Sequence, residues 1–376
     1  MNFSKIKRNF SNLPGWRTNR KIIVIETDDW GSTYMPSIDA YKSLSTKGLK
    51  LDTHYLQFDN FETNDDLLQL FEVLSKHKDA TGRPPVLTGV NVVANPNFER
   101  IKANGFQRYE YELWTDTAKR FKASDRVQEI WQNGIKERLM VPIFHGREHL
   151  NVQRWMKLLK QGNRSILDCF NHGVATISEG YGGEHFPDLR AAFDLDSVSE
   201  LISQKEILIA GLNAFEDTFG FRSSYFVPTN GPFNSSLEST LAQEGVKFIG
   251  TGKVHSSPVG GGKFKKSFKY IGKKNKFNQR YLTRNCFFEP SSTEHSRDKD
   301  WVDSCMSEIH SAFKLNKPAT ISSHRVNYMG GIVASNREDG LRKLDQLLVK
   351  IIQVWPGVEF MTSEELGELI LKTQKQ

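Results

Sequence analysis

Strand-like runs that alternate with helical patterns constrain the fold of this chain more than any other feature. Seven short apolar runs have the length and residue types of buried strands: 21–26, 85–93, 139–144, 223–227, 246–249, 281–288 and 319–323. Helical patterns lie between several of them, at 65–78, 151–161, 197–220, 237–245 and 341–355. We expect Asn64 or Asp65 to cap the first of these helices. This alternation predicts an α/β fold with a mostly parallel sheet.

The composition favours a globular protein and excludes several classes. The chain has 376 residues, 38% of them hydrophobic and 25% charged, and is long enough for one large barrel-type domain or two medium ones. It has no GxGxxG after a strand and no GxxxxGK[ST], so dinucleotide and P-loop sites have no support. The three cysteines are far apart and form no CxxC, which favours reduced thiols in a cytoplasmic protein. We expect no transmembrane segment, because no apolar run approaches the roughly 18 residues that cross a bilayer.

Positive charge is concentrated in one segment. The net charge is +7, and residues 260–280 contain seven lysines and one arginine. The segment could be a solvated hairpin or a mobile loop, or it could be a patch for an anionic substrate such as an acidic or phosphate-linked glycan. We expect no nucleic-acid partner, because no known binding motif frames these residues.

The first strand-like run ends in two adjacent carboxylates, in the stretch KIIVIETDDWGS at 21–32. One of the two, Asp28 or Asp29, could bind a metal while the other accepts a proton from an attacking water. A helix N-cap or a buried ion pair is the structural alternative for the same two residues.

A second candidate is VPIFHGREHLN at 141–151, where His145 and His149 stand four positions apart. If the chain becomes helical after Phe144, both imidazoles lie on one face and can meet one divalent metal. Two histidines and one aspartate would leave coordination open for water, as catalytic zinc sites require. Histidines at this spacing are also common without a metal, so the motif alone leaves both possibilities open.

ETDDWGS followed by HGREH resembles the polysaccharide deacetylase family, also called the NodB-homology domain or carbohydrate esterase family four. That family carries a T-F-D-D-G strand end and an H-x-x-x-H segment. The resemblance implies that Asp28 is the general base and that Asp29, His145 and His149 bind the metal. Zinc is the first choice of metal, and Co²⁺ or Ni²⁺ could fit the same nitrogen and oxygen donors.

Later stretches resemble the other motifs of the family in the same order. YFVPTNG (225–231) is similar to R-P-P-Y-G, which implies that the backbone N–H of Asn230 helps to form an oxyanion hole. KPATISSHRVNY (317–328) implies that His324 protonates the leaving amine, and KDWVDS (299–304) implies that Asp300 tunes His324. GVEFMTSEELGELI (357–370) resembles the closing strand and helix.

Each of these three residues also has a structural alternative. Asn230 could be an ordinary turn residue before Gly231. His324 could be a hydrogen-bonded histidine at a strand end, and Asp300 could simply cap the helix that follows it.

The sequence also departs from the family pattern. Trp30 separates the acid pair from Gly31, and Val227 stands where the arginine of the family contacts the base. Arg147 or Arg325 could replace that arginine, and the sequence does not decide between them.

The resemblance implies a distorted (β/α) barrel of about seven parallel strands. Residues 1–20 would be an N-terminal extension. Residues 21–372 would form a single catalytic domain with insertions near 95–138, 163–200 and 255–280.

The implied activity is hydrolysis of an N-acetyl group on a sugar or polysaccharide by attack of metal-bound water. The substrate would be an N-acetylated carbohydrate, with an anionic or carrier-linked sugar as an option. One alternative is a deformylase or another amide hydrolase on a carrier-linked sugar, and another is a non-catalytic glycan-binding protein with a degenerate site. The sequence leaves the oligomeric state open.

Overall fold

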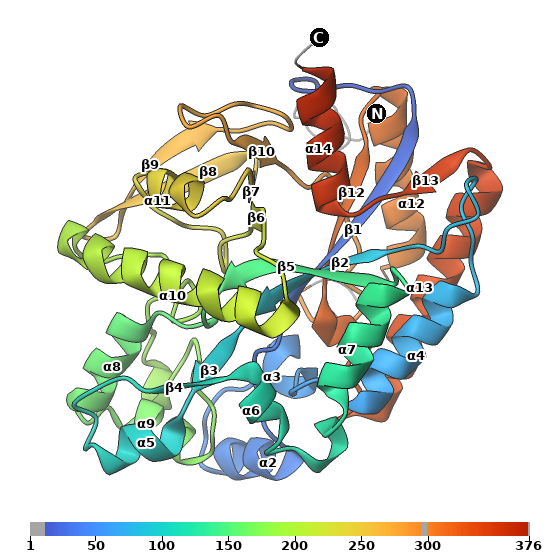
Figure 1. The fold of residues 1–376 in the computed structure, drawn as a ribbon. Helices are drawn as coiled ribbons and strands as arrows, with labels where there is room; N and C mark the ends of the chain where they lie inside the picture. The colour runs from blue at the N-terminus through green and yellow to red at the C-terminus, as the bar shows by residue number, and fades with distance from the viewer. Residues whose placement is uncertain (1–11, 295–298, 375–376) are drawn as a thin grey trace.

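One curled parallel sheet organises the molecule (Figure 1). Across the sheet the strands are β10 (Arg280–Leu282), β7 (Phe248–Gly250), β6 (Tyr225–Phe226), β5 (Met140–Gly146), β2 (Leu87–Val92), β1 (Lys21–Trp30), β12 (Ala319–His324) and β11 (Cys286–Phe287), and β13 (Val358–Phe360) pairs with the start of β1. Every pairing in this sheet is parallel. The computed structural model describes residues 12–294 and 299–374, so residues 1–11 of the expected extension lie outside the described residues.

The sheet is a half-barrel, and this confirms the predicted α/β class and the distorted barrel. It has nine strands where the sequence predicts about seven. The difference arises because the run at 281–288 divides into β10 and β11, and because the closing strand β13 joins the same sheet. In the described part of the chain no pairing connects β10 to β11, so the barrel stays open between them.

Helices cover the outside of the sheet and gather beyond its carboxyl edge. They are α2 (Ile38–Thr46), α3 (His54–Phe58), α4 (Asn64–Ser75), α5 (Phe98–Ala103), α6 (Trp114–Ala118), α7 (Val127–Lys136), α8 (Val152–Lys160), α9 (Arg164–Asn171), α10 (Leu201–Phe219), α11 (Leu237–Gln243), α12 (Trp301–Lys314), α13 (Ala334–Val354) and α14 (Ser363–Thr373). Thr63 caps α4 in a capping box, so the prediction of Asn64 or Asp65 is wrong by one or two residues. Within the described residues, no helix is both long and apolar enough to span a bilayer.

The pleat of β1 sorts its side chains between two cores. Ile23 and Ile25 point outward into the core beneath α4, α7, α10, α12 and α13. Ile22 and Val24 point into the half-barrel, where they meet side chains of α14. Because the side-chain period of a strand is two, Glu26 and Asp28 continue the inner row. The apolar half of β1 therefore fixes the direction in which its acidic half points.

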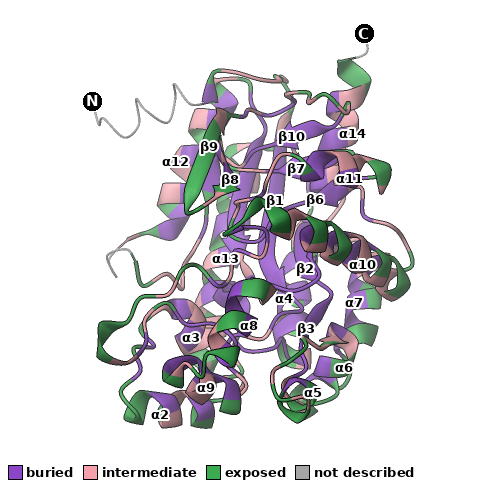
Figure 2. Ribbon diagram, turned by 90° about the vertical axis from the view of Figure 1, so that its left-hand side faces the viewer, coloured by how far each residue is buried: buried purple, intermediate pink, exposed green. Residues whose placement is uncertain are grey.

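Two small antiparallel hairpins flank the main sheet. β3 (Ala94–Pro96) pairs with β4 (Tyr111–Leu113), and β8 (Val254–Gly260) pairs with β9 (Lys263–Phe268). The second hairpin contains the start of the basic segment, and Figure 2 shows β9 exposed along its length. This part of the segment is therefore an ordered, solvated hairpin.

A fully buried ion-pair network anchors the chain just beyond β1. The guanidinium of Arg325 donates to Asp59 at 3.0 Å, to Glu62 at 2.5 Å and to the carbonyl of Ser32 at 2.5 Å. The side chains of Arg325 and of both acids have no exposed surface. Arg325 thus connects the end of β12 to the turn after β1.

We expect Arg325→Met to lower the free energy of unfolding by about 3–5 kcal/mol, because it leaves two buried carboxylates without their cation. Chemical denaturation followed by circular dichroism measures this cost. Arg342→Met is the matched control, since Arg342 pairs with Asp339 on the exposed face of α13 and such pairs contribute about 0–1 kcal/mol. Equal costs for the two substitutions would contradict the anchoring role.

Candidate metal and active site

A bulge at the end of β1 turns two neighbouring carboxylates toward one cleft. In a regular strand Asp28 and Asp29 would face opposite sides of the sheet. The pairing of β1 with β2 shifts register between Thr27 and Trp30, and Asp29 has a left-handed φ of 80°. The hydroxyl of Ser32 holds this turn by donating to the carbonyl of Asp29 at 2.7 Å. The strained backbone lets both acids serve one site.

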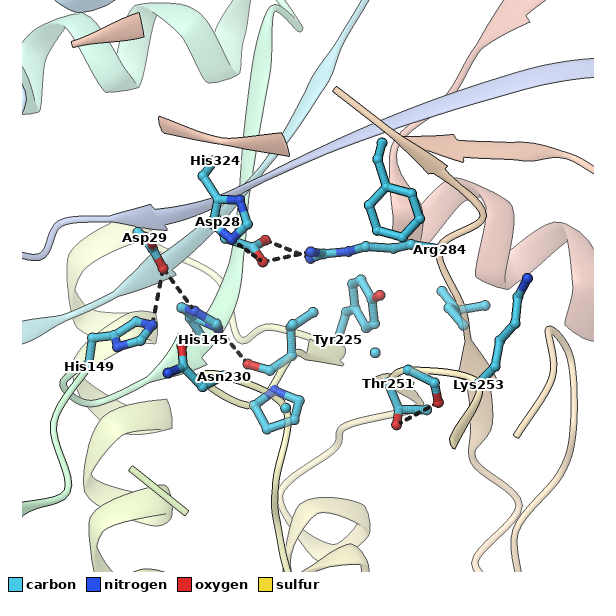
Figure 3. Close-up of a pocket in the computed structure, with 17 residues that line it drawn as sticks. Asp28, Asp29, His145, His149, Tyr225, Asn230, Thr251, Lys253, Arg284 and His324 are labelled. Atoms are coloured by element: carbon cyan, nitrogen blue, oxygen red, sulfur yellow. Dashed lines mark hydrogen bonds and ion pairs between the residues drawn. The ribbon is translucent and has the colours of Figure 1, made fainter. Parts of the chain in front are cut away.

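Asp29, His145 and His149 converge in this cleft (Figure 3). Asp29 Oδ1 lies 3.5 Å from His145 Nε2 and 3.1 Å from His149 Nε2, and all three side chains are buried. Ligand atoms that are about 2.1 Å from one ion at tetrahedral or right angles lie roughly 3.0–3.4 Å apart. The spacing therefore fits the ligand set of a single divalent cation.

The hydrogen bonds of His145 also fit a metal ligand. Its Nδ1 lies 2.7 Å from the carbonyl of Val227, so Nδ1 carries the proton and Nε2 presents its lone pair to the cluster. That Nε2 is buried and has no hydrogen-bond partner among the described residues. A buried nitrogen of this kind is costly unless another group, such as a cation, satisfies it.

The charges at the triad favour an added cation. Burial lowers the pKa of His149, which keeps its imidazole neutral and able to bind a metal. Burial alone would raise the pKa of Asp29, but the two histidines outweigh it and hold that pKa well below its usual value. The triad thus combines a neutral imidazole with an ionised carboxylate, which suits it to binding a cation.

The predicted helical geometry of the HxxxH segment is wrong, although its two histidines do meet. β5 continues through His145 to Gly146, and α8 begins only at Val152, after His149. The ring centroids of the two histidines lie 5.1 Å apart because the loop after β5 folds back toward the strand end. Gly146, with a φ of 143°, permits this turn.

Arg284 holds Asp28 by two hydrogen bonds. Its Nη1 and Nη2 each donate to one oxygen of Asp28 at 2.6 Å, and its Nε donates to Glu26. Glu26 is fully buried and also accepts from the hydroxyl of Tyr225 at 2.9 Å. Burial would raise the pKa of Asp28, but Arg284 outweighs it and keeps the pKa below its ordinary value. Asp28 is therefore an oriented, ionised carboxylate.

Arg284 corrects the prediction that Arg147 or Arg325 replaces the missing arginine at Val227. Arg147 pairs with Glu148 at 2.6 and 2.8 Å, and Arg325 belongs to the network with Asp59 and Glu62. Sequence analysis missed Arg284 because it lies within the run read as one strand. The two-residue alternation of side chains could have indicated Arg284. Leu282 of β10 points into the half-barrel, and Arg284 follows two residues later, so it is expected on the same side.

His324 lies beside Asp28 and is supported by Glu289. The two are register partners on β12 and β1, and His324 Nε2 lies 3.9 Å from Asp28 Oδ2. His324 Nδ1 lies 2.6 Å from Glu289 Oε1. Burial lowers the pKa of His324, but Glu289, Asp29 and Asp28 more than compensate and raise it to about 10.

The predicted pairing of Asp300 with His324 is not what the structure shows. Asp300 is the N-cap of α12, and its side chain accepts from the backbone N–H of Asp303 at 2.9 Å. Glu289 makes the contact instead, and a second bond, from Asn327 Nδ2 at 2.8 Å, holds it in place. Glu289 follows the short strand β11, a position that the single predicted strand concealed.

A cleft of about 460 Å³ contains this constellation. Asp28, Asp29, the two metal-site histidines and His324 line it, together with Arg284 and Asn230. Asn230 has a left-handed φ of 52°, and its side chain donates to Asp188 at 2.8 Å. The turn after β6 therefore places Asn230 at the rim of the cleft, facing the segment around residue 188.

Comparison with known proteins gives similarity in fold at low identity. No family model matches the sequence, and no curated protein matches it either. Similar solved structures include a probable polysaccharide deacetylase from Pseudomonas aeruginosa PAO1, with 8% identity, a TM-score of 0.46, and coverage of 93% of this chain and 91% of that one.

The PuuE allantoinase is similar with 9% identity, a TM-score of 0.47, and coverage of 94% and 93%. Peptidoglycan deacetylase PdaC from Bacillus subtilis is similar with 12% identity, a TM-score of 0.36, and coverage of 95% and 94%. These structural neighbours thus include polysaccharide deacetylases, the class whose motifs the sequence resembles. At such identities, the function has to be inferred from the residues of the site.

We expect the protein to take up one equivalent of divalent metal, and Asp29→Asn or His145→Ala to weaken its binding. The loss should exceed the roughly 10- to 100-fold that changes outside the ligand set produce, because a ligand itself is removed. Elemental analysis and calorimetric titration with Zn²⁺ measure stoichiometry and affinity. His172→Ala is the control, since His172 contacts Ser43 outside the cluster and should leave both unchanged. Wild-type affinity in the Asp29 and His145 variants would show that this is not the metal site.

Proposed function

We propose that this protein is a metal-dependent amide hydrolase that removes the N-acetyl group from a sugar. The observation that carries the proposal is that two neighbouring acids have different partners. Asp29 faces two histidines that leave it free to bind a cation, whereas Asp28 is held by Arg284 beside the proton donor His324. A carboxylate base and an imidazolium acid that lie side by side at a cation site suit hydrolysis of an amide.

Asp29, His145 and His149 would hold the cation, with Zn²⁺ as the first choice and Co²⁺ or Ni²⁺ fitting the same donors. When bound, such an ion polarises the acyl carbonyl and lowers the pKa of a water molecule. The tautomer of His145, fixed by the carbonyl of Val227, keeps the correct nitrogen directed to the ion.

The chain's own residues would move the protons. Asp28 takes one proton from the water as its oxygen attacks the acyl carbon, and Arg284 keeps Asp28 oriented for this step. The backbone N–H of Asn230 donates to the oxyanion, a contact worth roughly 3–4 kcal/mol in comparable sites. His324 then gives its Nε2 proton to the sugar nitrogen as the carbon–nitrogen bond breaks, which releases acetate and the free amine.

Arg284 also bears on the alternative of a degenerate, glycan-binding site. Val227 in place of the family arginine favours that alternative, but the guanidinium is supplied by Arg284 from the segment between β10 and β11. We also propose that the substrate is a carbohydrate and that the protein is cytoplasmic. The three cysteines are free and buried, which is compatible with a cytoplasmic location.

Metal-reconstituted protein should release acetate from N-acetylated sugars, and Asp28→Asn should lower kcat by at least about 100-fold because it removes a general base. An enzymatic assay for free acetate, run beside one for formate over free and carrier-linked sugars, measures this directly. Asp28→Asn should keep its metal, which separates loss of the base from loss of the ion. Formate in place of acetate would assign the deformylase alternative, and wild-type rates in Asp28→Asn would exclude the base assignment.

We expect Glu289→Gln to move the basic limb of the pH–rate profile to lower pH. His324 must be protonated to act as an acid, so activity is present below its pKa of about 10 and is lost as pH rises through it. Removing the charge of Glu289 lets burial lower that pKa, so the proton is lost earlier. The control is Asp300→Asn, which should leave the limb in place because Asp300 caps α12. If Asp300→Asn moves the basic limb of the pH–rate profile and Glu289→Gln does not, the assignment of Glu289 as the support of His324 is wrong.

A further inference from the structure

A second cavity of about 200 Å³ adjoins the cleft, and Arg190 lines it. The two cavities share a wall. Asn230 lines the cleft and donates to Asp188, which lines the second cavity, and Tyr34 of the second cavity contacts His149 of the cleft. Asp188 and Asn230 are both exposed, so a substituent of a substrate in the cleft can extend over this rim toward the second cavity.

Two stacked tyrosines separate Arg190 from the reacting groups. The guanidinium lies 5.0 Å from the ring centroid of Tyr55 and 5.9 Å from that of Tyr34. Tyr34 contacts His149 with a ring distance of 5.8 Å, and Tyr55 contacts His324 with a ring distance of 5.6 Å. Arg190 is thus one aromatic layer away from both the metal triad and the proton donor.

The guanidinium of Arg190 forms no direct ion pair with a carboxylate in the described part of the chain. Asp188, two residues earlier, accepts from the backbone N–H of Arg190 and from Asn230, and it makes no ion pair with the guanidinium. Arg147, Arg284 and Arg325, which also lie near the site, are each paired with carboxylates. Stacking on tyrosine occupies the face of a guanidinium and leaves its N–H edge able to bind.

We propose that Arg190 is a specificity-determining residue that binds an anionic substituent of the substrate, a carboxylate or a phosphate on the acylated sugar or on its neighbour. This inference rests on the proposed function, because it places the scissile amide in the adjoining cleft. The fork of N–H groups matches two oxygens of either anion, and the hydroxyls of Thr176 and Ser178 line the same cavity as further donors.

The test compares sugars that differ only in charge. N-acetylmuramic acid and its methyl ester form the carboxylate pair, and N-acetylglucosamine 6-phosphate and N-acetylglucosamine form the phosphate pair. Arg190→Gln should reduce the preference in kcat/KM for the charged member of one pair by about 10- to 100-fold, as expected for a charge-assisted hydrogen bond. Arg190→Lys should retain part of the preference.

Arg164→Gln is the matched control, since Arg164 also stacks on a tyrosine, Tyr181, but does so outside the cleft. It should leave both preferences unchanged. Calorimetry with the Asp28→Asn protein measures binding of each pair without turnover, and melting temperatures show whether each variant is folded.

Two results would overturn the proposal. One is an equal effect of Arg190→Gln on the charged and neutral members of both pairs. The other is a wild-type protein that binds neither charged sugar more tightly than its neutral partner, whether or not acetate is released. If a charged sugar is preferred, if the preference depends on Arg190, and if no acyl group is released, the anion site stands and the proposed hydrolysis fails.

Discussion

Buried negative charge at the carboxyl end of β1 is the constraint on which the site depends. Glu26, Asp28 and Asp29 lie within four residues of one strand, and Asp59 and Glu62 lie behind them. Each buried carboxylate has to be paired or hydrogen-bonded. The guanidinium of Arg284 pairs with Glu26 and Asp28 inside the half-barrel. The guanidinium of Arg325 pairs with Asp59 and Glu62 behind them. In the described chain no lysine or arginine pairs with Asp29, which contacts two imidazoles and the hydroxyl of Tyr34, so Asp29 is the charge left over for a cation.

The same constraint explains why one arginine can be supplied from an unexpected position. On the inner face of a curled sheet, side chains of several strands converge on one axis, so a guanidinium can reach Asp28 from more than one strand. Here the residue after β6 is apolar, and Val227 contributes its carbonyl to His145 instead of a side-chain charge. Arg284 reaches Asp28 from beyond β10 and is held by Glu26, which lies in the same inner row as Asp28. Asp28 needs a cation at this position, and the segment of the chain that supplies the cation can differ.

The sequence predicts the strands well and their interruptions poorly. β1 and β12 are found because each is a run of apolar residues with a polar end, and the two meet in the register that places Asp28 beside His324. The sequence shows Asp28 and Asp29 as an acidic pair, but it does not predict the left-handed bulge that lets both face one cleft. In a sequence, a positive φ is indicated mainly by glycine, and neither residue is a glycine. The helical expectation for His145 and His149 fails because four-residue spacing cannot distinguish a helix from a strand followed by a folded loop. Glu289 and Arg284 were missed because the break between β10 and β11 lies inside a continuous strand-like pattern.

The segment 163–200, which the resemblance to the deacetylases implies to be an insertion, lies beside the site and supplies none of Asp28, Asp29, His145, His149 and His324. It supplies Asp188, which fixes the side chain of Asn230, and Arg190, which stacks on the tyrosines that contact His149 and His324. The reacting groups lie on strand ends or just beyond them, where a rigid sheet sets their positions. Groups that select a ligand tolerate more variation, because they need only present the correct charge at the rim. Surface loops carry such variation at little thermodynamic cost. The positions of groups on the strand ends and the ligand preference of groups on the loops can therefore be set separately in one chain.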